Sequence, residues 1–408
     1  MAERETASLR WLVLLVGAAW VWAIGWPQAL VLIGISDFGT RFLDSYAVLA
    51  ALDAARAGLD PHAANAFDPL LRYHVYSDWW LALKWTGLGR AQNFFVGLSW
   101  VAAFGVAACA TLRPKNWRES LWLAAMLAAP PVLLAVIRAN NDLVIFVLLA
   151  VCGTLVAGEG KYRGLGAVAV LGLATGLKYY PVAGLAMLLW FRPVRQRPAV
   201  LAAGLLVTGL ALLSVLPAMS RAPLDVPAGL YTMGAPIWWR DLGWTDGQAR
   251  LPATLLLVAA GCGLAFSRIT TGLAFRGEQR ERTLAALGIS LLLFCFLAGV
   301  NFAYRWIFVA WVALWLWRRA GENAPSRERY AAGLACALAF LCLWSDGILC
   351  LVVNQLPRQS PAWIEHLLLV YRWWTQPLQW LLMALFTGWL LEAVLAHLRE
   401  WRQQRAAP

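Results

Sequence analysis

The chain has 408 residues, of which 61% are hydrophobic and only 14% charged, and its mean hydropathy is +0.62. This composition excludes a water-soluble domain with a single polar shell. The formal net charge of +12 fits contact with anionic lipid headgroups, and no stretch is typical of a nucleic-acid-binding module. We therefore expect a multi-pass membrane protein with membrane lipids, and no nucleic acid, among its partners.

Apolar stretches of about 20 residues bounded by charged residues recur along the whole chain. They predict an all-α polytopic membrane protein with about twelve transmembrane helices, at residues 11–35, 93–112, 119–137, 143–157, 164–177, 181–191, 199–217, 251–266, 283–300, 303–317, 330–352 and 376–396. The fifth and sixth segments could instead form one helix bent at Pro181. That alternative would place two basic clusters on opposite sides of the membrane, against the positive-inside bias.

Positive charge is divided unevenly between the connecting segments. The segments at one membrane face hold 21 of the 34 lysines and arginines, which predicts that this face and both termini are cytoplasmic. The chain is then a single integral membrane domain over residues 1–408, with outer loops at 37–92, 218–250 and 353–375. All eleven aspartates lie in outer loops or near the outer ends of predicted helices. Carboxylate chemistry is therefore expected at the outer face.

Metal and cofactor sites are not expected. The four histidines and seven cysteines show neither a paired spacing typical of zinc or haem ligands nor a disulfide framework.

Two aspartates, Asp37 and Asp44, follow the end of the first predicted helix, in the stretch ISDFGTRFLD. Alanine and leucine at helical spacing after Asp44 predict an amphipathic helix along the membrane surface, which Gly58 ends. Asp44 or Ser45 is a candidate N-cap of this helix. Asp37 could pair with Arg41 or simply end the first helix. Partial desolvation there would raise the pKa of a carboxyl toward the range of a useful general base.

Three basic residues are embedded near the outer ends of predicted helices, namely Arg138, Lys178 and Arg305. Cations at such depth are costly without a partner and are candidates for binding a lipid phosphate. The alternatives are snorkelling to the interface or pairing with an acid, for example Arg138 with Asp142. Asp346, inside the eleventh predicted helix, is a candidate counter-ion for one of these cations. Further candidate substrate-binding residues are Asn140, Asn141, Tyr179, Tyr180, Asn301, Tyr304 and His74.

Two stretches resemble a known family. DSYAVLAALDAARAGLDPH and RANNDLVIFVLLAVCGTLVAGEGKYRGLGAVAVLGLATGLKYYPVAGL are similar to the first outer loop and a later helix–loop–helix region of polyprenol-phosphate-sugar-dependent glycosyltransferases of the family 87 type, in the GT-C superfamily. The resemblance implies a GT-C-like helix bundle and transfer of a hexose, such as mannose, from a polyprenyl-phosphate donor to a lipid or glycan acceptor. The reaction would take place at the outer face of a bacterial inner membrane.

This reaction needs a base for the acceptor hydroxyl and positive charge at the departing phosphate. We expect Asp37 as the base, with Asp44 a close second, and inversion of the anomeric centre by a single displacement. The alternative from another class is a transporter or flippase for a lipid-linked sugar, which would also need embedded cations. Transporters usually have repeated halves with interrupted helices in matching positions. No internal repeat is visible in this chain.

Removal of the expected base gives the first test. Asp37→Asn should lower turnover by roughly 10²- to 10⁴-fold, the usual range for loss of a general base, and leave donor binding nearly intact. Turnover and donor affinity of the purified variant would be compared with those of Asp44→Asn. Near-normal turnover of Asp37→Asn beside an inactive Asp44→Asn would move the assignment to Asp44.

Overall fold

The computed structural model describes residues 2–36, 39–158, 160, 162–190, 197–221, 229–270, 277–321, 326–354 and 361–406. Within these ranges the chain is mostly helical. Its one sheet is an antiparallel pair of two-residue strands, β1 (Thr232–Met233) and β2 (Asn301–Phe302), in which Thr232 lies opposite Phe302. The prediction of an all-α protein is confirmed.

Seven helices in the described part of the chain are long and apolar enough to cross a membrane. An eighth span results if α4 (Trp117–Leu127) and α5 (Pro130–Ile137), which are bent by 62° at their junction, cross together. Two further apolar helices, α6 (Asp142–Ala157) and α7 (Arg163–Leu177), are shorter. The chain is thus a multi-pass membrane protein, and the number of twelve spans stays a prediction.

The predicted boundaries need three corrections. The first helix, α1 (Ala2–Gly25), ends before a separate 3-10 helix at Pro27–Ile33, so residues 11–35 are not one continuous helix. The predicted span at 181–191 lies almost wholly in a 3-10 helix, Tyr180–Trp190. Residues 361–375, expected in the third outer loop, are helical and continue into the last predicted span as α14 (Pro361–Ala406).

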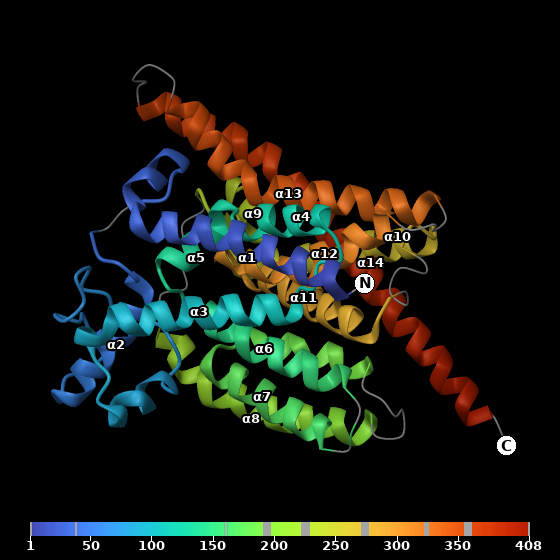
Figure 1. Cartoon of the computed structure of the whole chain (residues 1–408), viewed down its shortest axis with the longest axis horizontal. Coiled ribbons are helices and arrows are strands. Elements are labelled where there is room, and N and C mark those ends of the chain that lie inside the picture. Colours follow the sequence, from blue (N-terminus) through green and yellow to red (C-terminus); the bar gives the residue numbers. More distant parts are fainter. Residues whose placement is uncertain are drawn as a thin grey trace. The chain divides into compact units, whose positions relative to one another are not determined.

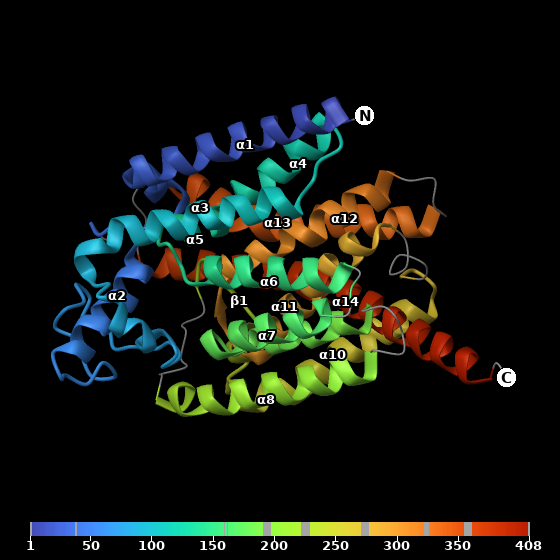
Figure 2. The ribbon, with the colours of Figure 1, turned by 60° about the horizontal axis from the view of Figure 1, so that its bottom comes forward.

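The chain divides into two compact units, and the first comprises Met1–Val31, Ile35–Lys115 and Val132–Asp225. Its other helices are α2 (Leu43–Arg56), α3 (Asn93–Thr111) and α8 (Arg197–Arg221). Helices α3, α6, α7 and α8 pack against one another in this order, as Figures 1 and 2 show from two directions. Small residues allow such helices to pack closely, as at Gly172 of α7, where a side chain would overlap Val207 of α8.

The second unit comprises Leu32–Gly34, Asn116–Pro131 and Val226–Pro408. Besides α4, α14 and the strands, its helices are α9 (Pro236–Asp241), α10 (Asp246–Phe266), α11 (Gln279–Ala298), α12 (Val309–Gly321) and α13 (Ser326–Val353), with a 3-10 helix at Ala303–Phe308. Every residue of α12 from Val309 to Leu316 is buried, as expected for a helix that is apolar all round. Helices α10 and α14 pack where Gly261 meets Thr387, and a side chain at Gly261 would overlap that threonine.

The segment after the first span places α2 against the start of α3. The ring of Phe42 covers Gly97, where any side chain would overlap it, and the Ser45 hydroxyl donates to Asn93 Oδ1 at 2.7 Å. The residue before the helix, Phe42, is left-handed (φ 57°) and no side chain caps the helix, so the prediction of Asp44 or Ser45 as N-cap is wrong. Gly58, with φ +74°, follows the helix end as expected.

The predicted topology can be tested by cysteine labelling. In a variant without the seven native cysteines, Ala64→Cys should react with a membrane-impermeant reagent added outside intact cells, and Ser326→Cys should react only after the cells are opened. Both positions are exposed in the structure, so a difference in reaction reports membrane side. Labelling of position 326 but not 64 in intact cells would contradict the topology.

Candidate functional site

Two backbone hydrogen bonds dock the start of α2 onto the end of α5. The Phe42 N–H donates to Ile137 O at 3.1 Å, and the Asp44 N–H donates to Arg138 O at 2.9 Å. Phe42 and Ala139, one on each side of this junction, both adopt positive φ, 57° and 41°. Such backbone conformations are costly for residues other than glycine and persist where surrounding contacts hold them, often at functional sites.

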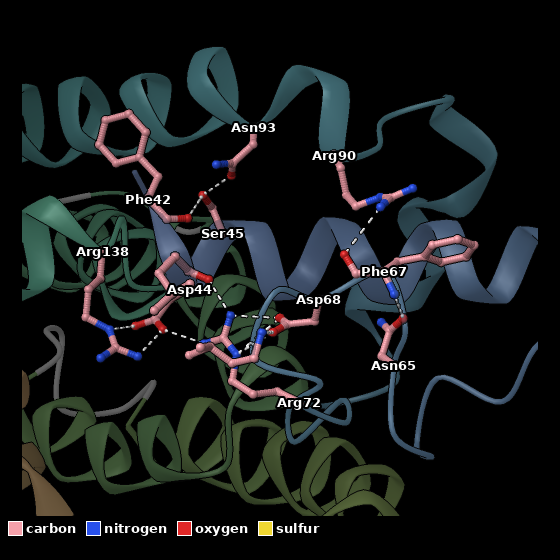
Figure 3. Close-up of polar contacts among 12 residues, drawn as sticks. Phe42, Asp44, Ser45, Asn65, Phe67, Asp68, Arg72, Arg90, Asn93 and Arg138 are labelled. Carbon is pink, nitrogen blue, oxygen red and sulfur yellow. Dashed lines mark hydrogen bonds and ion pairs between the residues drawn. The ribbon is translucent and has the colours of Figure 1, made fainter. Parts of the chain in front are cut away.

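The carboxylate of Asp44 lies at the centre of the junction with a side chain only 3% exposed. Arg138 binds it through two hydrogen bonds, Nε to Oδ2 at 3.0 Å and Nη2 to Oδ1 at 2.7 Å. The Asn140 amide donates to Oδ2 at 2.6 Å, and Arg72 Nη1 approaches Oδ1 at 3.4 Å. Figure 3 shows Arg138 and Arg72 reaching Asp44 from different segments. We call Asp44, Arg72, Arg138 and Asn140 the Asp44 cluster.

These partners determine the charge of Asp44. Burial raises the pKa of the carboxyl, but the charge and hydrogen bonds of Arg138, the hydrogen bond from Asn140 and the charge of Arg72 together outweigh burial and hold the pKa below its ordinary value. Asp44 also lies in the first turn of α2, where the helix dipole favours a negative charge. The expectation of a raised pKa at this acid is therefore wrong for Asp44. It is an ionised, weakly basic carboxylate.

Arg72 is held by more than Asp44. Its Nη2 donates to Asp68 Oδ2 at 2.8 Å and to Leu43 O at 2.7 Å, and its Nε lies 3.0 Å from Asp68 Oδ1. Asp68 is buried at 2% exposure. The long outer segment is therefore tied to the first turn of α2 by a buried acid and a half-buried arginine.

A second cluster contains Lys178, Asn141, Asp142 and Tyr180, which we call the Lys178 cluster. The Lys178 ammonium pairs with Asp142 and donates to Asn141 Oδ1 at 2.8 Å, and the Tyr180 hydroxyl donates to Asp142 Oδ1 at 2.6 Å. The suggested pairing of Arg138 with Asp142 is wrong, because Arg138 pairs with Asp44 and Lys178 pairs with Asp142.

Asn140 connects the two clusters within the first unit. Its amide nitrogen donates to Asp44, and its Oδ1 accepts the N–H of Asp142 at 2.9 Å. The predicted residues Asp44, Arg138, Asn140, Asn141, Lys178 and Tyr180 are thus brought together. Asp37 lies outside the described residues.

A hollow adjoins the Asp44 cluster. Its lining includes the apolar residues Ala23 and Ile24 of α1 and Pro27 of the following 3-10 helix, together with Arg138 and Arg41. The Arg138 side chain is 23% exposed and lines the hollow, although Asp44 is buried. An apolar wall beside a guanidinium suits an amphipathic anion.

His74 and Tyr179 lie at the edge of this region. His74 is buried, its Nε2 is 3.2 Å from Ser77 O, and its ring contacts those of His62 and Tyr76. Burial, together with the nearby His62, lowers the pKa of His74 to about 4, although the Ser77 carbonyl and Asp78 oppose this shift. His74 is therefore neutral at pH 7. Tyr179 packs edge-on against Tyr180, with ring centres 6.1 Å apart.

The remaining predicted residues belong to the second unit. Arg305 is buried and donates to the Asn301 side chain, whose amide nitrogen donates in turn to Cys295 O and to Gly299 O. Tyr304 stacks on Phe302 at 5.5 Å. Asp346 is not a counter-ion of the three predicted cations. It accepts hydrogen bonds from the Tyr371 hydroxyl at 2.9 Å and the Tyr231 N–H at 3.0 Å.

The sequence analysis missed Arg72 of the Asp44 cluster, its partner Asp68, and the role of Asp142 beside Lys178. One signal was available, because Asp68 and Arg72 are four residues apart and oppositely charged. Tyr76, whose ring centre is 5.8 Å from Lys178 Nζ, was also not among the predicted site residues. Comparisons with models of known protein families, with curated proteins and with solved structures give no match.

The buried pair can be tested by a double-mutant cycle. Asp44→Asn should destabilise the protein by about 2–3 kcal/mol, since a buried ion pair broken on one side costs about 3–5 kcal/mol and these arginines are partly exposed. The double variant Asp44→Asn with Arg138→Gln should recover part of that loss, as measured by denaturant unfolding in detergent.

The matched control is Asp53→Asn on the same helix. Asp53 also binds two arginines, Arg56 at 2.5 Å and Arg90 at 2.8 Å, but all three side chains are more than 20% exposed. Its loss should cost at most about 1 kcal/mol. Equal destabilisation by the two Asp→Asn variants would contradict the central role of Asp44.

Proposed function

We propose that this protein is a GT-C-type glycosyltransferase that transfers a hexose, such as mannose, from a polyprenyl phosphate to a lipid or glycan acceptor at the outer face of a bacterial inner membrane, with inversion. The observation that carries the proposal is the partly exposed Arg138 side chain, which is fixed by buried Asp44 and lines a hollow together with apolar residues. A polyprenyl phosphate has both features that this arrangement matches, a charged phosphate and an apolar chain.

The clusters suggest a division of roles. Arg138 contacts the donor phosphate and stabilises the negative charge that grows on it as the glycosidic bond breaks. Lys178 is 9% exposed and already engaged by Asp142 and Asn141. Lys178 therefore holds the turn that carries Arg138, and a direct contact with phosphate would require it to leave Asp142.

The base is assigned to Asp37 in this proposal. Asp44 receives hydrogen bonds from Arg138 and Asn140 and lies close to Arg72, and its lowered pKa makes it a poor proton acceptor. An acceptor hydroxyl could reach Asp44 only by displacing its most distant partner, Arg72 at 3.4 Å. Asp44 then orients the two arginines, and the proton of the acceptor hydroxyl passes to Asp37.

The alternative is a transporter or flippase for a lipid-linked sugar, which the same cationic hollow would also suit. The two functions differ in their products. A transferase releases polyprenyl phosphate in detergent solution, where no two-sided membrane exists, and a transporter releases none.

The test incubates the purified protein in detergent with polyprenyl-phosphate hexoses and a membrane extract as the source of acceptor, and measures released polyprenyl phosphate. Arg138→Lys keeps the charge but loses the two-pronged guanidinium geometry. We expect roughly 10- to 100-fold slower release, with kcat affected more than KM, because the phosphate gains charge in the transition state.

The control is Arg56→Lys, the same change at an exposed ion pair on α2, and it should retain near-normal release. If no polyprenyl phosphate is released with any hexose, and the lipid moves directionally in proteoliposomes, the protein is a transporter and the transferase assignment is wrong.

A further inference from the structure

A polar hollow lies inside the second unit, at the level where α13 and α14 meet the segment before α9. Its polar lining includes Thr232, Asp346, Tyr371, Arg372, Gln376 and Gln379. Four of these residues lie on α14 at positions 371, 372, 376 and 379, which share one face of a helix. They lie within a stretch, His366–Arg399, that is apolar enough to cross a membrane. Polar side chains are expensive at such positions and usually serve a function.

Two of these side chains lack a hydrogen-bond partner for a buried atom. Gln376 is 2% and Gln379 is 7% exposed, and the Oε1 atom of each is buried without a partner. A buried polar atom left unpaired costs free energy that a bound ligand or water would recover. The two unpaired amides therefore indicate that the hollow accommodates a group able to form hydrogen bonds.

The charges of the hollow favour a neutral ligand. Asp346 contributes a carboxylate, which disfavours an anion, and Arg372 contributes a guanidinium, which disfavours a metal cation. Arg372 is itself held by Asp241 at 3.1 Å. Each oxygen of Asp346 accepts one hydrogen bond, from Tyr371 or from Tyr231, and has a second lone pair that could accept another.

A hydroxyl group, like water, satisfies this lining. It both donates and accepts, so it pairs with a glutamine amide whichever way the amide is turned. It can donate to Asp346 and accept from Arg372.

The wall of the hollow is preformed. The Tyr231 N–H is held by Asp346, the Tyr231 hydroxyl donates to Ile33 O, and Tyr231 O accepts from the Ala303 N–H at 2.6 Å. The pairing of β1 with β2 fixes the adjacent Thr232. A rigid wall lowers the entropic cost of binding.

We propose that this hollow takes up one hydroxyl group of a neutral polyol, such as a sugar, through Asp346, Gln376 and Gln379. The proposal does not rest on the transferase activity, because it concerns binding alone. In a glycosyltransferase the site would hold a sugar of the acceptor.

The test measures thermal unfolding of the purified full-length protein in a detergent without a sugar headgroup, with increasing mannose, glucose, myo-inositol or glycerol. A ligand that binds only the folded state raises the unfolding temperature in a saturable way. Polyols also stabilise proteins by exclusion from the surface, an effect that does not saturate and does not depend on one side chain. A fully O-methylated hexoside, which has no hydroxyl to donate, should give no saturable shift.

Each of the variants Gln376→Leu, Gln379→Leu and Asp346→Asn should lower the affinity for the tightest-binding polyol by roughly tenfold or more. Gln403→Leu, the same change at an exposed position of α14, should leave its affinity unchanged. If one variant fails to fold, the other two variants and the O-methylated hexoside still test the proposal. Absence of a saturable shift with every polyol, equal affinity in wild type and all three variants, or saturable binding of sodium or potassium ions in place of polyols would each overturn the proposal.

Discussion

The buried ion pair between Asp44 and Arg138 is the interaction on which the outer part of the first unit depends. An ionised carboxylate that is 3% exposed must be fully partnered. The partners of Asp44 come from two segments far from α2 in the sequence, the loop around Arg72 and the turn after α5. The pair therefore helps to fix the start of α2 and the direction of the long outer segment. It also holds Asn140 where its side chain accepts the N–H of Asp142 at the start of α6.

The same constraint limits the chemistry of the site. Partners strong enough to keep Asp44 ionised also lower its affinity for a proton, so a carboxylate that holds two arginines in place is poorly suited to act as a base. Lys178 is limited in the same way, because its pairing with Asp142 holds its charge in place and leaves it less able to bind a ligand. Two cations line the hollow, Arg138, whose side chain is 23% exposed, and the exposed Arg41. The hollow of the second unit differs from this site. It is lined by charges of both signs, and two of its glutamines have a buried amide oxygen without a hydrogen-bond partner.

Much of the fold could be predicted from the sequence, because hydropathy and charge act locally. The all-α membrane class follows from composition, the helical segments follow from apolar stretches, and the end of α2 at Gly58 follows from the preference of glycine for positive φ. The choice of Asp44, Arg138, Asn140, Asn141 and Lys178 as candidates also came from the sequence. Charged and polar residues at the ends of apolar helices stand out against their surroundings, whatever their partners prove to be.

Which residues pair with which was decided only by the tertiary structure. Arg138 and Asp142 are four residues apart, and a continuous helix would bring them together. The positive φ of Ala139 interrupts the helix between them and directs Arg138 to Asp44, 94 residues away, while Asp142 meets Lys178. The spacing of polar residues on α14 was likewise visible in the sequence, but whether those residues face lipid, another helix or a hollow depends on the packing of α13 and the strand segment against them. Sequence reports local preference, and the partner of a buried charge is set by contacts between distant segments.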